Sequence, residues 1–241
     1  MFDYLLLLVP LPALGGFILL ALDPYKLDRR AVIAAAVVAG ALPLLLLVPL
    51  TLTCYLTGLC GDRVAQIFSL DIGGFEVAMA LGLDEISAVA GLTVTIIAAC
   101  VMTYAVQYMA KASTADLRRF FALMNLFVAG MLAMVLAADS VVLFLGWELM
   151  GLCSFFLIAY NTTSNRAFVA GQKAFVITRI GDATLLAGLL LLFLEAGTIR
   201  LDVLIPAGAA TTGAYGGLLA FFILLGALSK SAQLPFHTWL P

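Results

Sequence analysis

The sequence predicts an all-α, polytopic membrane protein with about seven transmembrane helices. Of its 241 residues, 64% are hydrophobic and only 11% are charged, whereas about a quarter of the residues in a soluble domain are charged. Seven segments are apolar over about 20 residues each, which is the length that crosses the hydrocarbon core of a bilayer. None of them alternates polar and apolar residues as the strands of a membrane barrel do.

The predicted spans are residues 4–22, 31–52, 86–109, 120–138, 140–160, 174–194 and 214–234. Asp3 precedes the first span, and no basic residue comes before Lys26. The first span therefore lacks the positive region of a cleavable signal peptide, and we expect it to be retained. From Arg119 onward the spans carry polar residues at depth, which places the functional region in the second half of the chain.

Basic residues predict the orientation, because short cytoplasmic loops are enriched in Lys and Arg. Eight of them follow the odd-numbered spans and two follow the even-numbered spans. The eight are Lys26, Arg29, Arg30, Lys111, Arg118, Arg119, Arg166 and Lys173, and the two are Arg63 and Arg200. The N-terminus is therefore expected outside.

Between the second and third spans, residues 53–84 are expected to form an outer loop with room for a short hairpin. Glycines and acidic residues interrupt the hydrophobic pattern there, namely Gly58, Gly61, Asp62, Asp71, Gly73, Gly74 and Glu76. A second glycine- and alanine-rich stretch, residues 207–217, is expected to be a loop into the seventh span.

The four cysteines do not form a metal-binding pattern, because no histidine or second close pair accompanies them. Cys54 and Cys60 lie on the predicted outer side, where a small disulfide can form, and the sequence leaves open whether they are bridged. Cys100 and Cys153 lie within spans, and we interpret them as small packing residues.

The seventh span is expected to break near Pro235. Proline has no amide donor and clashes with the carbonyl of Ser231, four residues earlier. Broken helices at membrane depth occur where protein or a water-filled cavity satisfies the backbone, and transporters place ion sites at such breaks. Lys230 lies about one turn before the expected break.

Ionisable residues inside the apolar spans are the strongest functional signal, because charges in a membrane are costly and usually mark an ion pathway. Glu148 lies nine residues into the fifth span, about 13 Å deep. Burial favours the neutral forms of both Glu148 and Lys230, so one hydrated cavity would let them exchange protons. Arg179 and Asp182 share a helix face at i, i+3, and we expect Asp182 to tune Lys230.

Structural roles are the alternatives for each of these groups. Glu148 can serve as a hydrogen-bonding group between helices, Lys230 can extend to the inner interface, and Arg179 with Asp182 can form a structural ion pair. Two further residues are candidate relays. His237, the single histidine, can instead bond a helix end, and Lys173 can instead anchor the inner interface.

The sequence contains no phosphate-binding glycine loop, no zinc pattern, no histidine pair for haem and no cysteine cluster for iron and sulfur. We expect no cofactor, metal or redox centre in this chain. The net charge of −2 gives no argument for a nucleic-acid partner. Energy for ion movement would have to arrive through other subunits.

Four motifs resemble the antiporter-like subunits of respiratory complex I, most closely the subunit L type. They are Arg118-Arg119-Phe120-Phe121 with Asn125-Leu126-Phe127; Gly146-Trp147-Glu148 with Gly151-Leu152-Cys153-Ser154; Lys173-Ala174-Phe175 with Thr178-Arg179-Ile180-Gly181-Asp182; and the run from Ser229-Lys230-Ser231 to Pro241. Together they cover roughly the second half of the chain.

This resemblance implies proton translocation by a membrane-arm subunit of NADH:quinone oxidoreductase in a bacterial-type inner membrane, with other subunits and lipid as partners. Glu148 and Lys230 would transfer protons in a half-channel, and Asp182 and Arg179 would tune them. The fold implied is the N-terminal half of an inverted-repeat antiporter-like fold. Residues 1–109 would be flanking helices, and 110–241 an incomplete first repeat that another polypeptide or a missing part completes.

Related families share the motifs, so other interpretations stay open. Mrp-type sodium/proton antiporters have similar Trp-Glu and Lys-Ser-Ala-Gln elements, and membrane subunits of inorganic-carbon uptake systems and of membrane-bound hydrogenases are similar too. Leu149 after Glu148 favours the antiporters, whereas the string from Thr178 to Asp182 favours complex I. A truncated scaffold that conducts nothing is a further alternative.

Overall fold

The computed structural model describes residues 2–22, 26–58, 60, 63–72, 75–161 and 163–240. Seven helices in this part of the chain are long and apolar enough to cross a membrane. The predicted fold class, a polytopic helical membrane protein, is confirmed. Gly61, Asp62, Gly73, Gly74 and Pro241, which entered the predictions above, lie outside the described residues.

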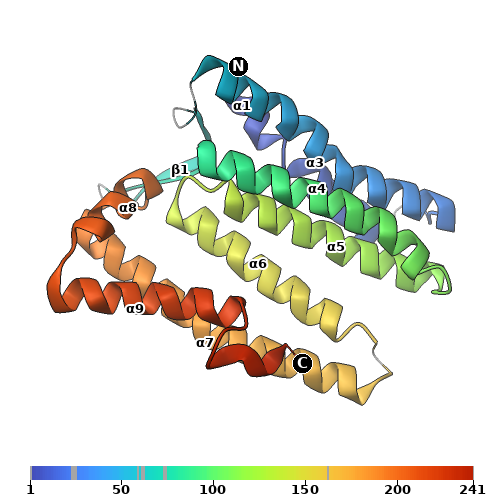
Figure 1. Ribbon diagram of the computed structural model, residues 1–241. Helices are drawn as coiled ribbons and strands as arrows, with labels where there is room; N and C mark the ends of the chain where they lie inside the picture. The colour runs from blue at the N-terminus through green and yellow to red at the C-terminus, as the bar shows by residue number, and fades with distance from the viewer. Residues whose placement is uncertain are drawn as a thin grey trace.

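The elements in chain order are α1 (Phe2–Leu7), α2 (Leu11–Leu22), α3 (Arg29–Thr57), β1 (Arg63–Ile72), β2 (Phe75–Leu83), α4 (Glu85–Tyr108), α5 (Thr114–Val135), α6 (Ser140–Ile158), α7 (Asn165–Ala196), α8 (Leu201–Ala210), α9 (Gly213–Lys230) and the 3-10 helix η1 (Phe236–Trp239). Two groups of helices are visible in Figure 1. Helices α1 to α5 form one group, α7, α8 and α9 form the other, and α6 runs between them.

Polar N-caps set where several helices begin, and this explains two predicted boundaries that were wrong. The Asp28 side chain accepts from the Ala31 amide, and Ser164 accepts from the Ala167 amide. These caps start α3 and α7 in the polar residues before each apolar run. Hydropathy placed both starts too late, and Lys173 consequently lies inside α7 instead of at its inner end.

The first predicted span is interrupted, which the sequence analysis did not predict. A turn at residues 8–10 separates α1 from α2. Pro10 ends this turn, and its ring lacks the amide that would continue the helical hydrogen bonds. The stretch Tyr4–Leu22 still qualifies by length and composition as one membrane span.

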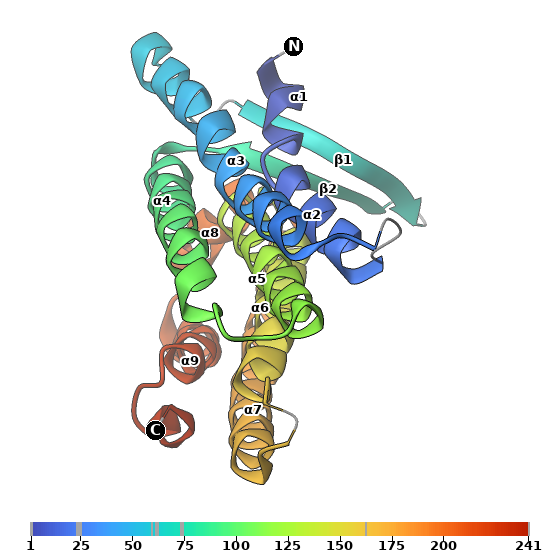
Figure 2. The same ribbon diagram turned by 90° about the vertical axis from the view of Figure 1, so that its right-hand side faces the viewer.

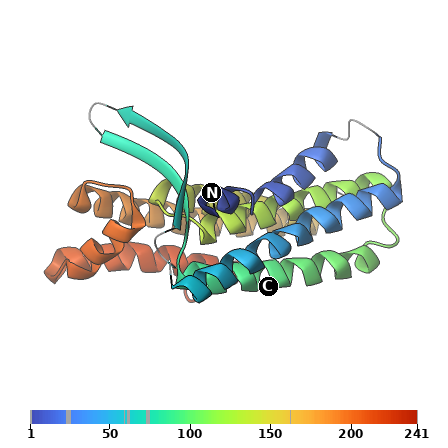
Figure 3. The same cartoon turned by 90° about the horizontal axis from the view of Figure 1, so that it is seen from above.

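The predicted outer loop contains a long hairpin. Strands β1 and β2 pair antiparallel from Arg63↔Leu83 to Ile72↔Phe75, with an irregularity between Gln66 and Phe68. Figure 2 shows the hairpin beside α1 and α2, and Figure 3 shows it leaning away from the helices. A disulfide joins Cys54, in the last turn of α3, to Cys60, with 4.9 Å between their Cα atoms.

The predicted loop over residues 207–217 is wrong. Helix α8 runs to Ala210 and α9 starts at Gly213, so only residues 211–212 separate them. Alanine favours helix, which the interpretation of this stretch as a loop underweighted. Gly213 has φ 73°, a backbone conformation that glycine adopts without steric cost.

The predicted break in the seventh span is confirmed. Helix α9 ends at Lys230, so the break begins directly after this residue and not one turn later. The Gln233 amide donates to the Leu228 carbonyl oxygen at 2.9 Å, and η1 follows Pro235. Lys230 is therefore presented at the C-terminal end of a helix within the apolar part of the chain.

Candidate functional site

Lys230 contacts the tryptophan of the fifth span. Its Nζ donates to the Trp147 carbonyl oxygen at 3.1 Å and lies 5.3 Å from the centroid of the Trp147 ring. The neighbouring Ser229 carbonyl oxygen accepts from Trp239 Nε1 at 2.9 Å. The second tryptophan thus satisfies one of the backbone acceptors that the end of α9 leaves open.

Arg179 lies between the two acids of the site, of which only Asp182 is fully buried. Its Nη1 pairs with Glu148 Oε2 and lies 3.7 Å from Asp182 Oδ2, and its guanidinium stacks 4.6 Å from the Phe175 ring centroid. In the described part of the chain Glu148 pairs with Arg179, and no ion pair joins Glu148 to Lys230 directly. A functional link between Glu148 and Lys230 stays a prediction.

Asp182 is almost fully buried, at 1% exposure. Its Oδ1 accepts from Trp147 Nε1 at 2.5 Å. Its Oδ2 accepts no hydrogen bond from the described residues. Trp147 therefore contacts both Asp182 and Lys230, which makes it the member of the site that connects α6, α7 and α9.

Helices α7 and α9 lie close together at small residues. A Cβ on Gly181 would lie 1.7 Å from Ser229 Oγ, and one on Gly226 would lie 2.7 Å from Leu185 Cβ. Small residues at helix contacts let backbones in a membrane approach closely. This contact places Asp182, next to Gly181, beside Lys230, next to Ser229.

Two predicted relay residues lie away from the cluster. Lys173 is exposed on α7, and His237 is exposed on η1. Neither side chain makes a hydrogen bond or ion pair within the described part of the chain. Their relay roles stay predictions without geometric support.

Sequence reasoning missed Asp139, which lies at the start of α6. It is 1% exposed. Its Oδ1 accepts from the amides of Val141 and Val142, and its Oδ2 accepts from the Ala80 amide of β2 at 2.7 Å. Burial raises the pKa of this carboxyl, against the opposing effect of these backbone bonds. An Asp immediately before an apolar run is an N-cap signature that could have identified it.

The segment around Asp139 is paired on both sides. The Ala138 amide donates to the Ala80 carbonyl oxygen at 3.0 Å, the Ser140 amide donates to Ile199 at 2.9 Å, and the Leu201 amide donates to Ala138 at 3.0 Å. One end of α6 is thus fixed to the hairpin and to the start of α8.

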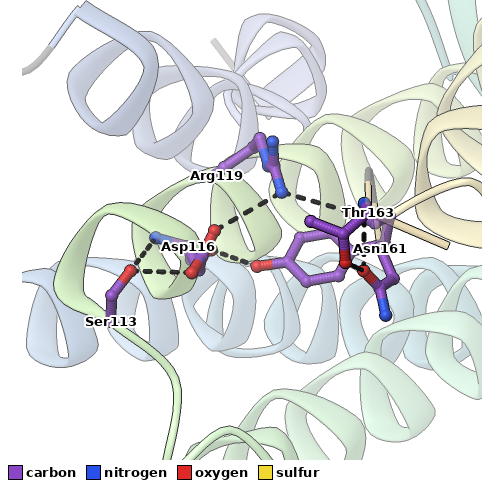
Figure 4. Close-up of polar contacts among 6 residues, drawn as sticks. Ser113, Asp116, Arg119, Asn161 and Thr163 are labelled. Carbon is purple, nitrogen blue, oxygen red and sulfur yellow. Dashed lines mark hydrogen bonds and ion pairs between the residues drawn. The ribbon is translucent and has the colours of Figure 1, made fainter.

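The other end of α6 is held through the Arg-Arg-Phe-Phe motif, of which Figure 4 draws Arg119 with its contact to Asp116. Arg119 Nη2 donates to the Tyr160 carbonyl oxygen at 3.1 Å, and the Tyr160 hydroxyl donates to the Asp116 carbonyl oxygen at 2.6 Å. The Phe120 ring meets the Tyr160 ring edge-on, with 5.6 Å between centroids. Burial raises the pKa of Tyr160. This motif joins α5 to the end of α6.

The described residues contain no group of three or more His, Cys, Asp or Glu side chains arranged to hold a metal ion. The charges of the site are instead paired with one another and with backbone groups. The arrangement thus brings two acids, an arginine and a lysine together inside apolar spans, where ionisable groups are costly.

Two family models match the chain. Residues 137–241 match "NADH:quinone oxidoreductase/Mrp antiporter, TM", and residues 70–121 match "NADH-Ubiquinone oxidoreductase (complex I), chain 5 N-terminus". The first range contains Glu148, Arg179, Asp182 and Lys230. Together the two ranges take in more than half of the chain.

The curated relatives of the chain agree with these family models. The chain is 38% identical over 176 residues to NADH-quinone oxidoreductase subunit L of Mycobacterium tuberculosis, a match that covers 73% of this chain and 28% of the relative. It is 37% identical over 174 residues to the Escherichia coli subunit L, covering 71% of this chain and 28% of the relative. The chain thus spans about a quarter of the length of these relatives.

Among solved structures, the Mrp complex from Dietzia sp. has a similar chain. The TM-score is 0.75 at 30% identity, and the match covers 98% of this chain and 25% of that chain. The similarity therefore extends through the N-terminal helices that the sequence motifs leave out.

Proposed function

Because the chain belongs to the antiporter-like family that NADH:quinone oxidoreductase shares with the Mrp antiporters, we propose that it moves protons across a membrane as a cofactor-free subunit of a larger complex. The observation that carries this proposal is the cluster of Glu148, Arg179, Asp182 and Lys230 at the broken end of α9. Ionisable groups in apolar spans and helix breaks at membrane depth both mark ion pathways.

The contacts support a different role for each of these side chains. Arg179 is permanently charged and pairs with both acids. Lys230 instead donates to a neutral carbonyl oxygen, so it can lose its proton without breaking an ion pair in this arrangement. A neutral amine still has hydrogens to donate. In this proposal Lys230 carries the proton, Glu148 exchanges protons with it, and Asp182 with Arg179 adjusts its charge.

Glu148 is the more accessible acid, with 23% of its side chain exposed against 2% for Asp182. This supports Glu148 as the entry or exit group of the half-channel. A neighbouring membrane-arm subunit or the remainder of the fold would supply the rest of the path. The driving reaction would take place in other subunits.

We further propose that the N-terminus lies outside a bacterial-type cytoplasmic membrane. The asymmetry of Lys and Arg supports this orientation. The Cys54–Cys60 disulfide joins the last turn of α3 to Cys60, at the end of the chain's second span, which the orientation places outside. Disulfides persist in oxidising compartments, so the bridge and the charge asymmetry agree.

Replacement of Lys230 tests the proposal. Membranes that hold the complex of Lys230→Ala should lose at least about tenfold in proton transport, while the subunit still assembles. Lys111→Ala is the matched control, because Lys111 is exposed between α4 and α5. Wild-type proton transport in the assembled Lys230→Ala complex would overturn the proposal and favour the non-conducting scaffold.

A sodium/proton antiporter subunit is the second candidate, and the similarity to a chain of the Mrp complex supports it. The two candidates differ in what drives transport. Sodium-dependent proton movement in vesicles without a quinone substrate would favour the antiporter, whereas proton movement that requires NADH and quinone would favour complex I. Glu148→Gln should impair both, and unchanged flux in that variant would favour the scaffold.

A further inference from the structure

Two polar atoms of the site lack the partners that their burial calls for. Asp182 Oδ2 is buried and accepts no hydrogen bond from the described residues. Its nearest cation, Arg179 Nη1 at 3.7 Å, is beyond ordinary hydrogen-bond distance and also pairs with Glu148. The Lys230 ammonium, meanwhile, has a carbonyl oxygen as its acceptor. A buried carboxylate oxygen and an amine with no acid partner thus occur in the same site.

Gly151 lies between these two atoms. A Cβ built on Gly151 would be 3.0 Å from Lys230 Nζ and 3.8 Å from Asp182 Oδ2. The absence of a side chain at this position therefore leaves open the space through which the two groups face each other. Any larger residue at this position would fill that space.

Trp147 fixes both ends of this arrangement. Its Nε1 donates to Asp182 Oδ1, so the other carboxylate oxygen is left to face Gly151. Its carbonyl oxygen and ring hold the Lys230 amine. Both contacts come from one residue, four positions before Gly151 on the same helix, so Trp147 and Gly151 share one face of α6.

We propose that Lys230 has two positions in its working cycle, one on the Trp147 carbonyl oxygen and one on Asp182 Oδ2, and that Gly151 is the positioning residue that keeps the second position open. This inference rests on the proposed proton-carrying role of Lys230. The neutral amine stays on the carbonyl oxygen, because a neutral donor needs no counter-charge. The protonated ammonium moves to the carboxylate, because a buried cation is strongly favoured beside an anion.

The charged groups around Lys230 fit this assignment. Asp182 and Arg179 face it from α7, and Glu148 lies on α6 with Arg179 against it. His237 of η1 is exposed, and Arg200 and Asp202 beside α8 are exposed and paired with each other. Asp182 is therefore the anion that a protonated Lys230 can reach without displacing Arg179 from Glu148.

Gly151→Ala in the assembled complex tests the inference. The added methyl group would keep the Lys230 ammonium away from Asp182. The fold should tolerate this methyl group, because its nearest neighbour is Lys230 Nζ, the end of a flexible side chain. We expect proton transport to fall at least about tenfold and the midpoint of its pH profile to move by about one unit. Gly217→Ala is the control, since a Cβ there has nothing within 4 Å, and it should match the wild type.

The pH profile separates positioning from damage, because a smaller amount of folded protein scales the curve without moving its midpoint. A lowered rate with an unmoved midpoint in Gly151→Ala overturns the inference, as does a wild-type rate and midpoint. If Gly151→Ala fails to assemble, Trp147→Phe provides the test, because it keeps an aromatic ring but removes the Nε1 donor that orients Asp182. An unmoved midpoint of the pH profile in Trp147→Phe overturns the inference.

Lys230→Ala, measured in parallel, distinguishes failure of the two-position inference from failure of the proposed function. If Lys230→Ala loses proton transport while Gly151→Ala keeps the wild-type rate and midpoint, the two-position inference is wrong and the proposed function is still supported. Normal transport in Lys230→Ala removes both.

Discussion

The two groups of helices on either side of α6 differ in the kind of side chains that they bury. The first, α1 to α5, encloses one large cluster of buried apolar side chains that includes Leu47, Met102, Phe121 and Leu132. The second, α7 to α9, buries a small apolar cluster of Leu192, Leu204 and Leu219. Its interior is instead occupied by charges and by close contacts of small residues.

The buried polar groups of the two regions differ in the same way. Asn125 in the first group is neutral, and its Nδ2 donates to the Phe121 carbonyl oxygen at 2.9 Å. Asp182 in the second group is an ionisable acid at 1% exposure. The first group therefore resembles an ordinary core, in which volume matters more than identity, whereas the second depends on single residues. The predictions below test this contrast.

The largest expected effect is at the contact of α7 with α9. Gly181→Ala would place a Cβ 2.3 Å from Ser229 Cβ, and overpacking of this kind costs about 1–3 kcal/mol and occasionally more. We expect most of the folded subunit to be lost, as measured by the yield of assembled complex and by its thermal stability. Ser229→Gly in the same chain removes the clashing atoms and should restore assembly.

Leu132→Met is the matched change in the first group, because Leu132 is fully buried in α5. A swap that conserves volume should cost less than about 1.5 kcal/mol. The contrast between the two groups would fail if Leu132→Met were as damaging as Gly181→Ala.

The second effect is at Asp139, where α6 joins the hairpin. Asp139→Asn keeps an oxygen for the amides of Val141 and Val142 but turns a donor toward the Ala80 amide. An unsatisfied buried donor costs about 1–3 kcal/mol. Thermal stability should fall by a corresponding amount, and Asp139→Ala, which also removes the cap, should fall further. Equal stability of the wild type and Asp139→Asn would contradict this role.

Asp139 also predicts a pH dependence. Burial raises the pKa of the folded carboxyl above its ordinary value of 3.8, so the folded chain holds this proton more tightly than the unfolded chain. Its contribution to stability is present below about pH 3.8 and declines as pH rises through the raised pKa. Asp139→Asn does not titrate, and its stability curve should lack this decline over the same pH range.

Hydropathy was sufficient for the spans, and the proline chemistry of Pro235 was sufficient for the break, because both depend on local composition. The helix ends were harder, since Asp28 and Ser164 extend α3 and α7 beyond the apolar runs. The partner of each charge could not be predicted. The pairing of Arg179 with Glu148 depends on how α6 and α7 are rotated against each other, and periodicity within one helix does not fix that rotation.

The same limit applies to Trp147, which the sequence analysis names only as part of a motif. Its contacts with Asp182 and Lys230 come from two other helices. Gly151 and Gly181 were visible as letters in the motifs, but their significance is the space that they leave for atoms of distant residues. Residue types were thus predictable, and their distances were not.

A third and smaller effect is expected at Tyr160, where α6 ends. Tyr160→Phe removes the hydroxyl that donates to Asp116 but keeps the ring against Phe120. A neutral hydrogen bond contributes about 1 kcal/mol, so thermal stability should fall by about that amount, with proton transport unchanged. A loss as large as that of Asp139→Asn would show that both ends of α6 are fixed equally strongly.

The smallest effect is expected for the side chains of Arg200 and Asp202. The hydrogen bond from Arg200 lowers the pKa of Asp202, so the pair stabilises the chain above about pH 3.8 and loses this contribution as pH falls through the lowered pKa. Both side chains are more than half exposed, at 60% and 58%. Arg200→Ala should therefore change stability by less than about 0.5 kcal/mol. The backbone at this position bridges Asp139, and the neighbouring Leu201 amide donates to the Ala138 carbonyl oxygen at 3.0 Å. Leu201→Pro removes that donor and should be far more damaging than Arg200→Ala. Comparing the two variants in thermal unfolding would show that the chain's path at this junction, and not its surface charge, holds α6 in place.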